Sequence, residues 1–254
     1  MNLVLISLFS IFMNLGFSTK NFTSEVFTWD LITAKKINSG EQKEFLSNGT
    51  TNYLDRFEIN AITVEPGKTF PEKNFKENTE KLIIVKTGKL DFILNNEKLS
   101  IGTGSIVLAG LKDEINILNK TIDPITFFLF QWKSKDGKAL NNQTFKAQVL
   151  YWENVAFKTT EKGGTRSFLR IPTDLLEEFE MHVTTLNVGV KSHDPHTHPD
   201  DEIILVKKGK VEELVNGKPY QMGVGSFVLL NGNEPHGIRN IGDTPCEYYA
   251  FRFK

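Results

Sequence analysis

The sequence is poor in several features that mark particular classes of protein. Cys246 is the only cysteine, which excludes an intramolecular disulfide. The formal net charge is −1 at pH 7, so no strong field favours nucleic acid or an anionic membrane as a partner. The sequence has almost no helical pattern. The segment that comes closest to one, 172–179, is too short to organise a fold. The sequence therefore argues against a nucleic-acid-binding protein and against a fold built on helices.

Long apolar runs are also lacking, except at the N-terminus. Residues 3–17 are almost purely apolar, and the run ends at Ser18. A transmembrane helix needs about 20 such residues, whereas this length is typical of the apolar part of a secretory signal. We therefore expect residues 1–20 to be a cleaved signal peptide, with no stable membrane insertion afterwards and a secreted or periplasmic location. A mis-assigned start codon would instead leave the protein in the cytoplasm.

What the sequence does contain favours an all-β protein. Phe, Val, Ile and Thr occur in short runs that Gly, Asn and Pro interrupt, which is typical of strands and tight turns. Asn216-Gly217 is a strong signal for a two-residue hairpin turn. Short strands at this spacing predict a sandwich or a closed barrel of the jelly-roll type. The strands expected in the C-terminal half are 179–186, 202–208, 210–215, 226–230, 236–239 and 246–253.

The chain also repeats itself at an offset of about 121 residues. The segment 102–108 (GTGSIVL) matches 223–229 (GVGSFVL), and Trp29-Asp matches Trp152-Glu when the offset widens slightly. A period of this length indicates two copies of one domain, because solenoid repeats are far shorter. We predict an N-terminal domain over 21–135 and a C-terminal domain over 136–254.

Histidine is scarce, and its placement is informative. The chain has five histidines, and four of them lie in the segment 193–198 or at His236. His196 and His198 are two residues apart, so on a strand they would point to one face, and Glu202 keeps the same parity. Neutral imidazole and carboxylate are the ligands expected for Mn, Fe, Ni, Cu or Zn. The pattern therefore predicts a transition-metal site.

The spacing of these residues resembles the two signatures of the cupin superfamily, and the two copies resemble a bicupin. The first signature is Gly, a spacer, His-x-His, a short gap, Glu, six residues and Gly, which fits 189–209. The second signature fits 225–240, with Asn231 and Asn233 in place of the usual Pro and Gly. The resemblance implies two tandem jelly-roll (cupin) β-barrels. It also implies that one divalent metal is held by His196, His198, Glu202 and His236.

The first copy lacks this ligand set. At the repeat offset the four ligands map onto Phe75, Glu77, Lys81 and Ile115. Phe75 and Ile115 would fill the volume with apolar bulk, as a close-packed core requires. Lys81 could place an ammonium group where the metal charge would be, with Glu77 as its partner. We therefore expect the N-terminal domain to be degenerate and metal-free, and the C-terminal domain to contain the site.

Four protein ligands would leave about two positions of an octahedral ion open for substrate oxygens. Three neutral imidazoles and one carboxylate leave a divalent site net positive, which favours small keto acids, hydroxy acids, sugar-derived acids or ureido acids. The expected metal is Mn²⁺, followed by Fe²⁺, Zn²⁺ or Ni²⁺. We expect a metal-dependent enzyme, a hydrolase or isomerase before a dioxygenase. The alternative is a non-catalytic protein that binds a sugar or an organic acid.

Three further residues are candidates for contact with a substrate. Arg239 follows His236 by three residues, His182 lies in the middle of a predicted strand, and Tyr248 lies on the last one. Exposed apolar strand faces would also permit a homodimer. The segment 180–189 resembles the entry strand of the ureidoglycine aminohydrolase group of manganese bicupins. That group uses Glu, His, His and Gln at the four ligand positions, so the likeness is architectural.

Overall fold

The computed structural model describes residues 20–135 and 145–254, and within those ranges it contains strands and three short 3-10 turns but no α-helix. The turns are Trp29–Leu31, Glu72–Asn74 and Trp152–Asn154. No helix of the described part is long and apolar enough to cross a membrane. The segment expected to be a signal peptide lies outside the described residues, apart from Lys20.

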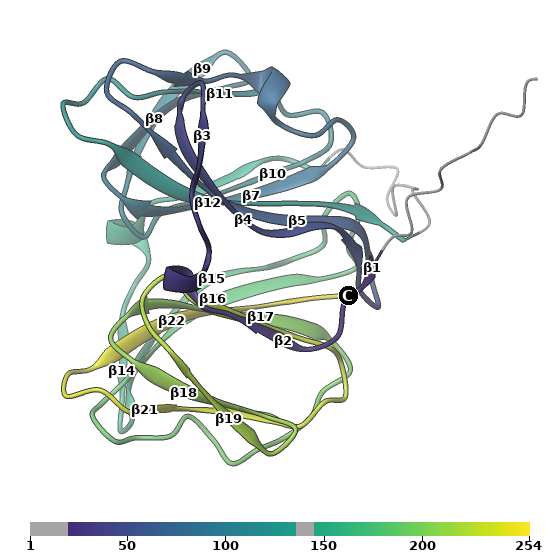
Figure 1. Cartoon of the computed structure of the whole chain (residues 1–254), viewed down its shortest axis with the longest axis vertical. Helices are drawn as coiled ribbons and strands as arrows, with labels where there is room; N and C mark the ends of the chain where they lie inside the picture. Colours follow the sequence, from purple (N-terminus) through teal and green to yellow (C-terminus); the bar gives the residue numbers. More distant parts are fainter. Residues whose placement is uncertain (1–19, 136–144) are drawn as a thin grey trace, which may run out of the picture.

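Two barrels lie one above the other, each made of a large and a small sheet (Figure 1). The large sheet of the first barrel has the order β1-β4-β5-β12-β7-β10-β13, with β3 paired to β4, and its small sheet has the order β6-β11-β8-β9. The large-sheet strands are β1 (Lys20–Asn21), β3 (Lys35–Ile37), β4 (Gly40–Thr50), β5 (Leu54–Val64), β7 (Glu80–Thr87), β10 (Ile106–Ala109), β12 (Ile125–Ser134) and β13 (Gln148–Leu150). The small-sheet strands are β6 (Thr69–Phe70), β8 (Lys89–Leu94), β9 (Glu97–Gly102) and β11 (Ile115–Leu118).

The second barrel repeats this plan. Its large sheet has the order β14-β15-β16-β22-β17-β20-β2, and its small sheet has the order β19-β18-β21. The large-sheet strands are β2 (Glu25–Phe27), β14 (Lys158–Thr160), β15 (Gly163–Ile171), β16 (Phe179–Leu186), β17 (Asp201–Lys208), β20 (Phe227–Leu230) and β22 (Cys246–Phe253). The small-sheet strands are β18 (Val211–Val215), β19 (Lys218–Met222) and β21 (His236–Asn240). The all-β fold class with two tandem jelly-roll barrels is confirmed.

The large sheets of the two barrels face each other and bury a shared aromatic core (Figure 1). Ring pairs cross this interface, with centroids 5.2 Å apart for Phe130 and Phe251 and 5.8 Å apart for Phe57 and Phe253. Each barrel also has its own apolar interior between its large and small sheets. Because strands alternate their faces, one side of each large sheet fills the interface and the other side fills or lines a barrel.

One edge strand from each half of the chain belongs to the barrel of the other half. β2 pairs with β20 in the second barrel, and β13 pairs with β10 in the first. Phe27 of β2 stacks on Phe227 of β20 with a centroid distance of 4.8 Å. The barrels therefore complete each other's large sheets. The boundaries 21–135 and 136–254 stay a prediction, because sequence similarity locates the copies but not which barrel each edge strand joins.

Candidate metal centre

Three structural elements bring the predicted ligands together at one end of the second barrel. Glu202 lies on β17, His236 begins β21, and His196 and His198 lie in the loop between β16 and β17. That loop is fixed to β21, since the backbones of His196 and His236 exchange two hydrogen bonds of 3.1 Å. The backbone N–H of Asn233 also donates to the carbonyl of His198 at 2.6 Å. The histidine pair, although outside a strand, is thus held by backbone contacts.

The side chains converge as the spacing predicts. The ring nitrogens of His196, His198 and His236 that could bind an ion lie within 4.8 Å of one another. Oε2 of Glu202 lies 3.1 Å from Nε2 of His198 and 3.2 Å from Nε2 of His236. Two ligand atoms about 2.1 Å from one ion and at right angles stand about 3.0 Å apart, so these separations suit a shared cation. His236 is 2% exposed, whereas the side chain of His196 is open to solvent.

The electrostatics of the cluster favour an ionised carboxylate. Burial opposes ionisation of Glu202, but the hydrogen bond from His198 and the close imidazole of His236 outweigh it and lower its pKa to about 2. The hydrogen bond to Glu202 raises the pKa of His198. Burial and the neighbouring imidazoles lower the pKa of His196, which favours the neutral form that binds metals. The site therefore pairs one negative charge with imidazoles in close contact.

A divalent transition metal fits these residues. Nε2 of His236 is buried and makes no hydrogen bond of acceptable geometry, and a buried polar atom of this kind needs a partner. Nδ1 of the same ring bonds to the carbonyl of Glu234 at 2.9 Å, which orients Nε2 toward the cluster. Nδ1 of His198 bonds in the same way to the carbonyl of Asp200 at 3.0 Å. Three histidines could hold the ion, and ligation by the full set with Glu202 stays a prediction.

A cavity of about 210 Å³ opens beside the cluster. Of the residues predicted to contact a substrate, His182 and Tyr248 line it. The hydroxyl of Tyr248 is hydrogen-bonded to Ser192 and Thr184, and burial strongly raises its pKa. Arg239 does not reach this cavity. It points away from the barrel, where its guanidinium is 2.8 Å from the carboxylate of Glu212.

Two charged residues near the site were not identified from the sequence. Arg252 lines the cavity, and its Nη2 donates to Glu180 at 2.5 Å. Glu213 is fully buried inside the barrel, where burial and the charge of Glu202 raise its pKa well above the usual value. A signal for both was present, because Arg252 shares the parity of Tyr248 along β22 and Glu213 shares the parity of the buried Val211 and Val215 along β18. His193 also lines the cavity, with its ring 4.1 Å from that of His196.

The matching positions of the first barrel have a different character. Phe75 and Ile115 are buried in the apolar cluster of that barrel, where Phe75 contacts Phe70 edge to face. Lys81 is also buried, and its Nζ donates to the carbonyl of Thr79 at 3.2 Å. Burial lowers its pKa, and the charges that oppose this effect come from Glu72, Asp113 and Glu80 rather than from Glu77. An apolar core thus occupies the place that corresponds to the histidine cluster.

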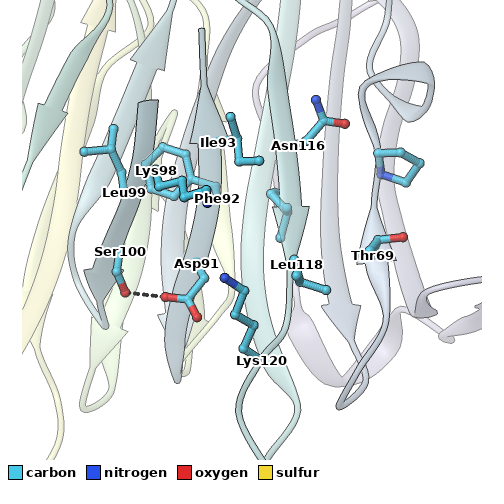
Figure 2. Close-up of a pocket in the computed structure, with 12 residues that line it drawn as sticks. Thr69, Asp91, Phe92, Ile93, Lys98, Leu99, Ser100, Asn116, Leu118 and Lys120 are labelled. Carbon is cyan, nitrogen blue, oxygen red and sulfur yellow. Dashed lines mark hydrogen bonds between the residues drawn. The ribbon is translucent and has the colours of Figure 1, made fainter. Parts of the chain in front are cut away.

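A larger hollow of about 460 Å³ lies on the first barrel, over β8, β9 and β11 (Figure 2). Its walls are mostly apolar, with Ile93 and Leu118 among the side chains that line it. Asp91 is the only carboxylate in the lining, and it accepts a hydrogen bond from Ser100 at 2.5 Å. The lining contains no histidine. Within residues 20–135 and 145–254, the group of histidines that could hold a metal ion is the one beside the smaller cavity of the second barrel.

Comparisons with known proteins agree with this placement. Residues 182–252, which include the four predicted ligands, match the cupin domain family. An L-ectoine synthase from Rhodococcus opacus is 35% identical over 81 residues, which are 32% of this chain and 61% of that protein. The chain thus spans less than two thirds of the length of the curated relatives that it matches.

Solved structures with the same fold cover both barrels. A glyoxylate-induced protein from Pseudomonas aeruginosa aligns with a TM-score of 0.73 at 13% identity, over 91% of this chain and 88% of that one. An oxalate decarboxylase from Lactobacillus farciminis, solved as a formate complex, aligns with a TM-score of 0.68 at 10% identity, over 89% and 85%. Residues 182–252 therefore match the cupin domain family, and the fold of both barrels is similar to that of these solved structures.

Proposed function

We propose that the protein is a metal-dependent enzyme that acts on a small oxygen-rich acid at the second barrel. The observation that carries the proposal is the convergence of His196, His198, His236 and Glu202 beside a cavity. A barrel does not need such a cluster for stability, since burying polar groups without compensation costs several kcal/mol. The bound metal would polarise a carbonyl or acidify a water. Mn²⁺ is the metal we propose first, followed by Fe²⁺, Zn²⁺ or Ni²⁺.

The size of the cavity supports a small substrate. A volume of about 210 Å³ is below the range of about 300–1,000 Å³ that is typical of pockets for drug-sized ligands, which favours an acid of a few carbon atoms. The oxalate decarboxylase of the same fold was solved with formate, which is an acid of this size. We include keto acids, hydroxy acids, sugar-derived acids and ureido acids in the substrate class.

The chain's own residues would bind and orient such an acid. The guanidinium of Arg252 faces the cavity and could hold a carboxylate, because Arg presents paired donors that match it. Arg252 shares the carboxylate of Glu180 with Arg170 and His182. The hydroxyl of Tyr248 is a neutral group that could donate to a substrate oxygen. His182, whose pKa burial lowers, lies on the same wall and could accept a proton.

The proposal extends to the place where the protein works. The apolar run 3–17 supports export, and we propose a secreted or periplasmic enzyme that begins near residue 21 after cleavage. The measurement is the N-terminal sequence of the protein recovered from its source. An intact N-terminus on a cytoplasmic protein would contradict this part of the proposal.

The function is tested by thermal denaturation with two- to four-carbon keto and hydroxy acids. We expect these acids to raise the melting temperature of the Mn²⁺-loaded protein but not of the metal-free protein. NMR of the same mixtures then shows whether the acid is consumed. A shift without consumption supports the alternative, a non-catalytic protein that binds small acids. Equal shifts in both forms would contradict a role for the metal.

A further inference from the structure

The two barrels are joined by a pair of contacts to buried carboxylates that the repeat relates to each other. In one, Thr173 of the second half donates its hydroxyl to the carboxylate of Glu80 in the first barrel, at 2.9 Å. In the other, Asn52 of the first barrel donates to the carboxylate of Asp201 in the second. The contacts correspond at the repeat offset, but only Asp201 is followed by a predicted metal ligand, Glu202.

The carboxylate of Asp201 is 0% exposed and has three donors. The backbone N–H of Asn52 donates to Oδ2 at 3.0 Å, and its side-chain Nδ2 donates to Oδ1 at 2.8 Å. The third donor is the backbone N–H of Gly232, which reaches Oδ1 at 2.9 Å. One buried carboxylate thus joins a loop of the first barrel to the turn that precedes His236.

The turn that contains Gly232 and Asn233 contacts the loop that carries His198 and leads into His236. The backbone N–H of Asn233 donates to the carbonyl of His198 at 2.6 Å. Gly232 packs so closely that a Cβ atom there would lie 1.9 Å from the carbonyl oxygen of Pro199, which excludes any other residue without a shift. The relative position of His198, Glu202 and His236 therefore depends on this turn and on Asp201.

The N-terminal arm of the chain holds the same turn from its other end. The side chain of Asn231 donates through Nδ2 to the carbonyl of Phe22 at 2.8 Å, and its backbone N–H donates to the hydroxyl of Ser24 at 2.8 Å. The arm continues into β2, which extends the large sheet of the second barrel. Two segments from the N-terminal half thus contact the loops that carry the ligands.

We propose that Asn52 is a positioning residue for the metal centre, so that the degenerate barrel completes the site of the other barrel. Asn52 acts through Asp201, whose carboxylate it holds against Gly232 while Glu202, the next residue, points into the barrel. The inference rests on the proposed metal site. It gives the first barrel a role that does not require a ligand of its own.

The change that tests the inference is Asn52→Ala, which removes the Nδ2 donor but keeps the backbone N–H. Outer contacts of metal ligands typically alter metal affinity by about 10- to 100-fold, and Asn52 acts through an intermediate residue, so we expect about a tenfold loss of Mn²⁺ affinity. Asn52→Thr restores a hydroxyl donor, which is the group that the related contact uses at Thr173, and should recover part of the affinity.

Thr173→Val is the matched control. It removes the hydrogen bond to Glu80 in the related contact and lowers the melting temperature, but no ligand-bearing loop lies beside it. Mn²⁺ affinity is measured by calorimetry, and the visible spectrum of the Co²⁺-loaded protein reports the ligand geometry. We expect both readouts to change in Asn52→Ala and to stay as in the wild type in Thr173→Val.

Two results would overturn the inference while leaving the metal site intact. One is wild-type Mn²⁺ affinity and an unaltered Co²⁺ spectrum in Asn52→Ala. The other is an equal loss of affinity in both variants, which would show general destabilisation. If the wild-type protein binds neither Mn²⁺ nor Co²⁺, the proposed function fails and this inference fails with it.

Discussion

Glu80 lies at the interface of the two barrels and links the stability of the chain to pH. Its carboxyl group is 0% exposed and accepts hydrogen bonds from Nε1 of Trp132 at 2.8 Å, the hydroxyl of Thr173 at 2.9 Å and the backbone N–H of Leu175 at 3.2 Å. Burial nevertheless dominates, because these donors do not compensate for lost solvation, and it raises the pKa of Glu80 to about 7.

The sign and size of the effect follow from the two states of this group. In the unfolded chain the carboxyl ionises near pH 4.5, whereas in the native protein it keeps its proton until about pH 7. The contribution of Glu80 to the free energy of unfolding is therefore fully present below pH 4.5 and is lost as the pH rises to about 7. Above about pH 7 this contribution no longer changes. At about 1.4 kcal/mol for each pH unit of difference, the loss is about 3 kcal/mol.

Glu80→Gln isolates this contribution, because glutamine is uncharged throughout the range. We expect the difference in unfolding free energy between the wild type and the variant to change by about 3 kcal/mol between pH 4 and pH 8, in favour of the wild type at pH 4. Urea titrations of both proteins at half-unit pH steps measure it. A difference that is constant with pH would refute the reasoning, since Glu80 would then ionise alike in both states.

Two further predictions concern the exchanged strand and the cavity. Phe27→Ala removes the ring that stacks on Phe227 and should lower the free energy of unfolding by about 3–5 kcal/mol in urea titrations, whereas Phe157→Ala, at a ring that is 45% exposed, should cost less. Equal costs would contradict the importance of β2. Arg252→Met should reduce the melting-temperature shift given by small keto and hydroxy acids without changing metal content, whereas Arg239→Met should change neither. An unaltered shift in Arg252→Met would exclude it as a carboxylate anchor.

Much of the fold could be predicted from the sequence because its signals are local. Short runs of Phe, Val, Ile and Thr bounded by Gly, Asn and Pro, together with the Asn216-Gly217 turn, placed the strands of the second barrel, and the structure has them at β16, β17, β18, β20, β21 and β22. The exchange of β2 and β13 could not be predicted in the same way. Each is a three-residue edge strand, and its partner is decided by packing between segments far apart in the sequence.

In the site, too, some residues could be predicted from their spacing in the sequence, whereas others depend on contacts between distant segments. Glu202 and His236 lie on strands at the predicted positions, whereas His196 and His198 lie in a loop that a backbone bridge to β21 holds beside them. Arg239 was selected for its nearness to His236, although the odd spacing of the two along β21 places them on opposite faces. Arg252 has the same parity as Tyr248 along β22, so its face of the strand could be predicted. Its position at the cavity depends on the pairing of β22 with β17 and β16, which places it opposite Glu202 and Glu180.

The contacts of Asn52 with Asp201 lay beyond sequence reasoning for another reason. The two residues belong to different barrels, and their contact depends on how the large sheets dock. The repeat indicates that Asn52 corresponds to Thr173 and Asp201 to Glu80, but correspondence within a repeat does not reveal contact between its copies. Only the packed structure shows that each barrel supplies a donor to a buried carboxylate of the other.

The central claim, a single transition-metal site in the second barrel, is tested most directly by elemental analysis. The protein from residue 21 onward is prepared without a histidine tag, beside a His196→Ala/His236→Ala variant. The account predicts one tightly held transition metal per chain in the wild type and none in the variant. No metal after loading, or two metals per chain, would contradict it, the second result because the first barrel would then also hold an ion.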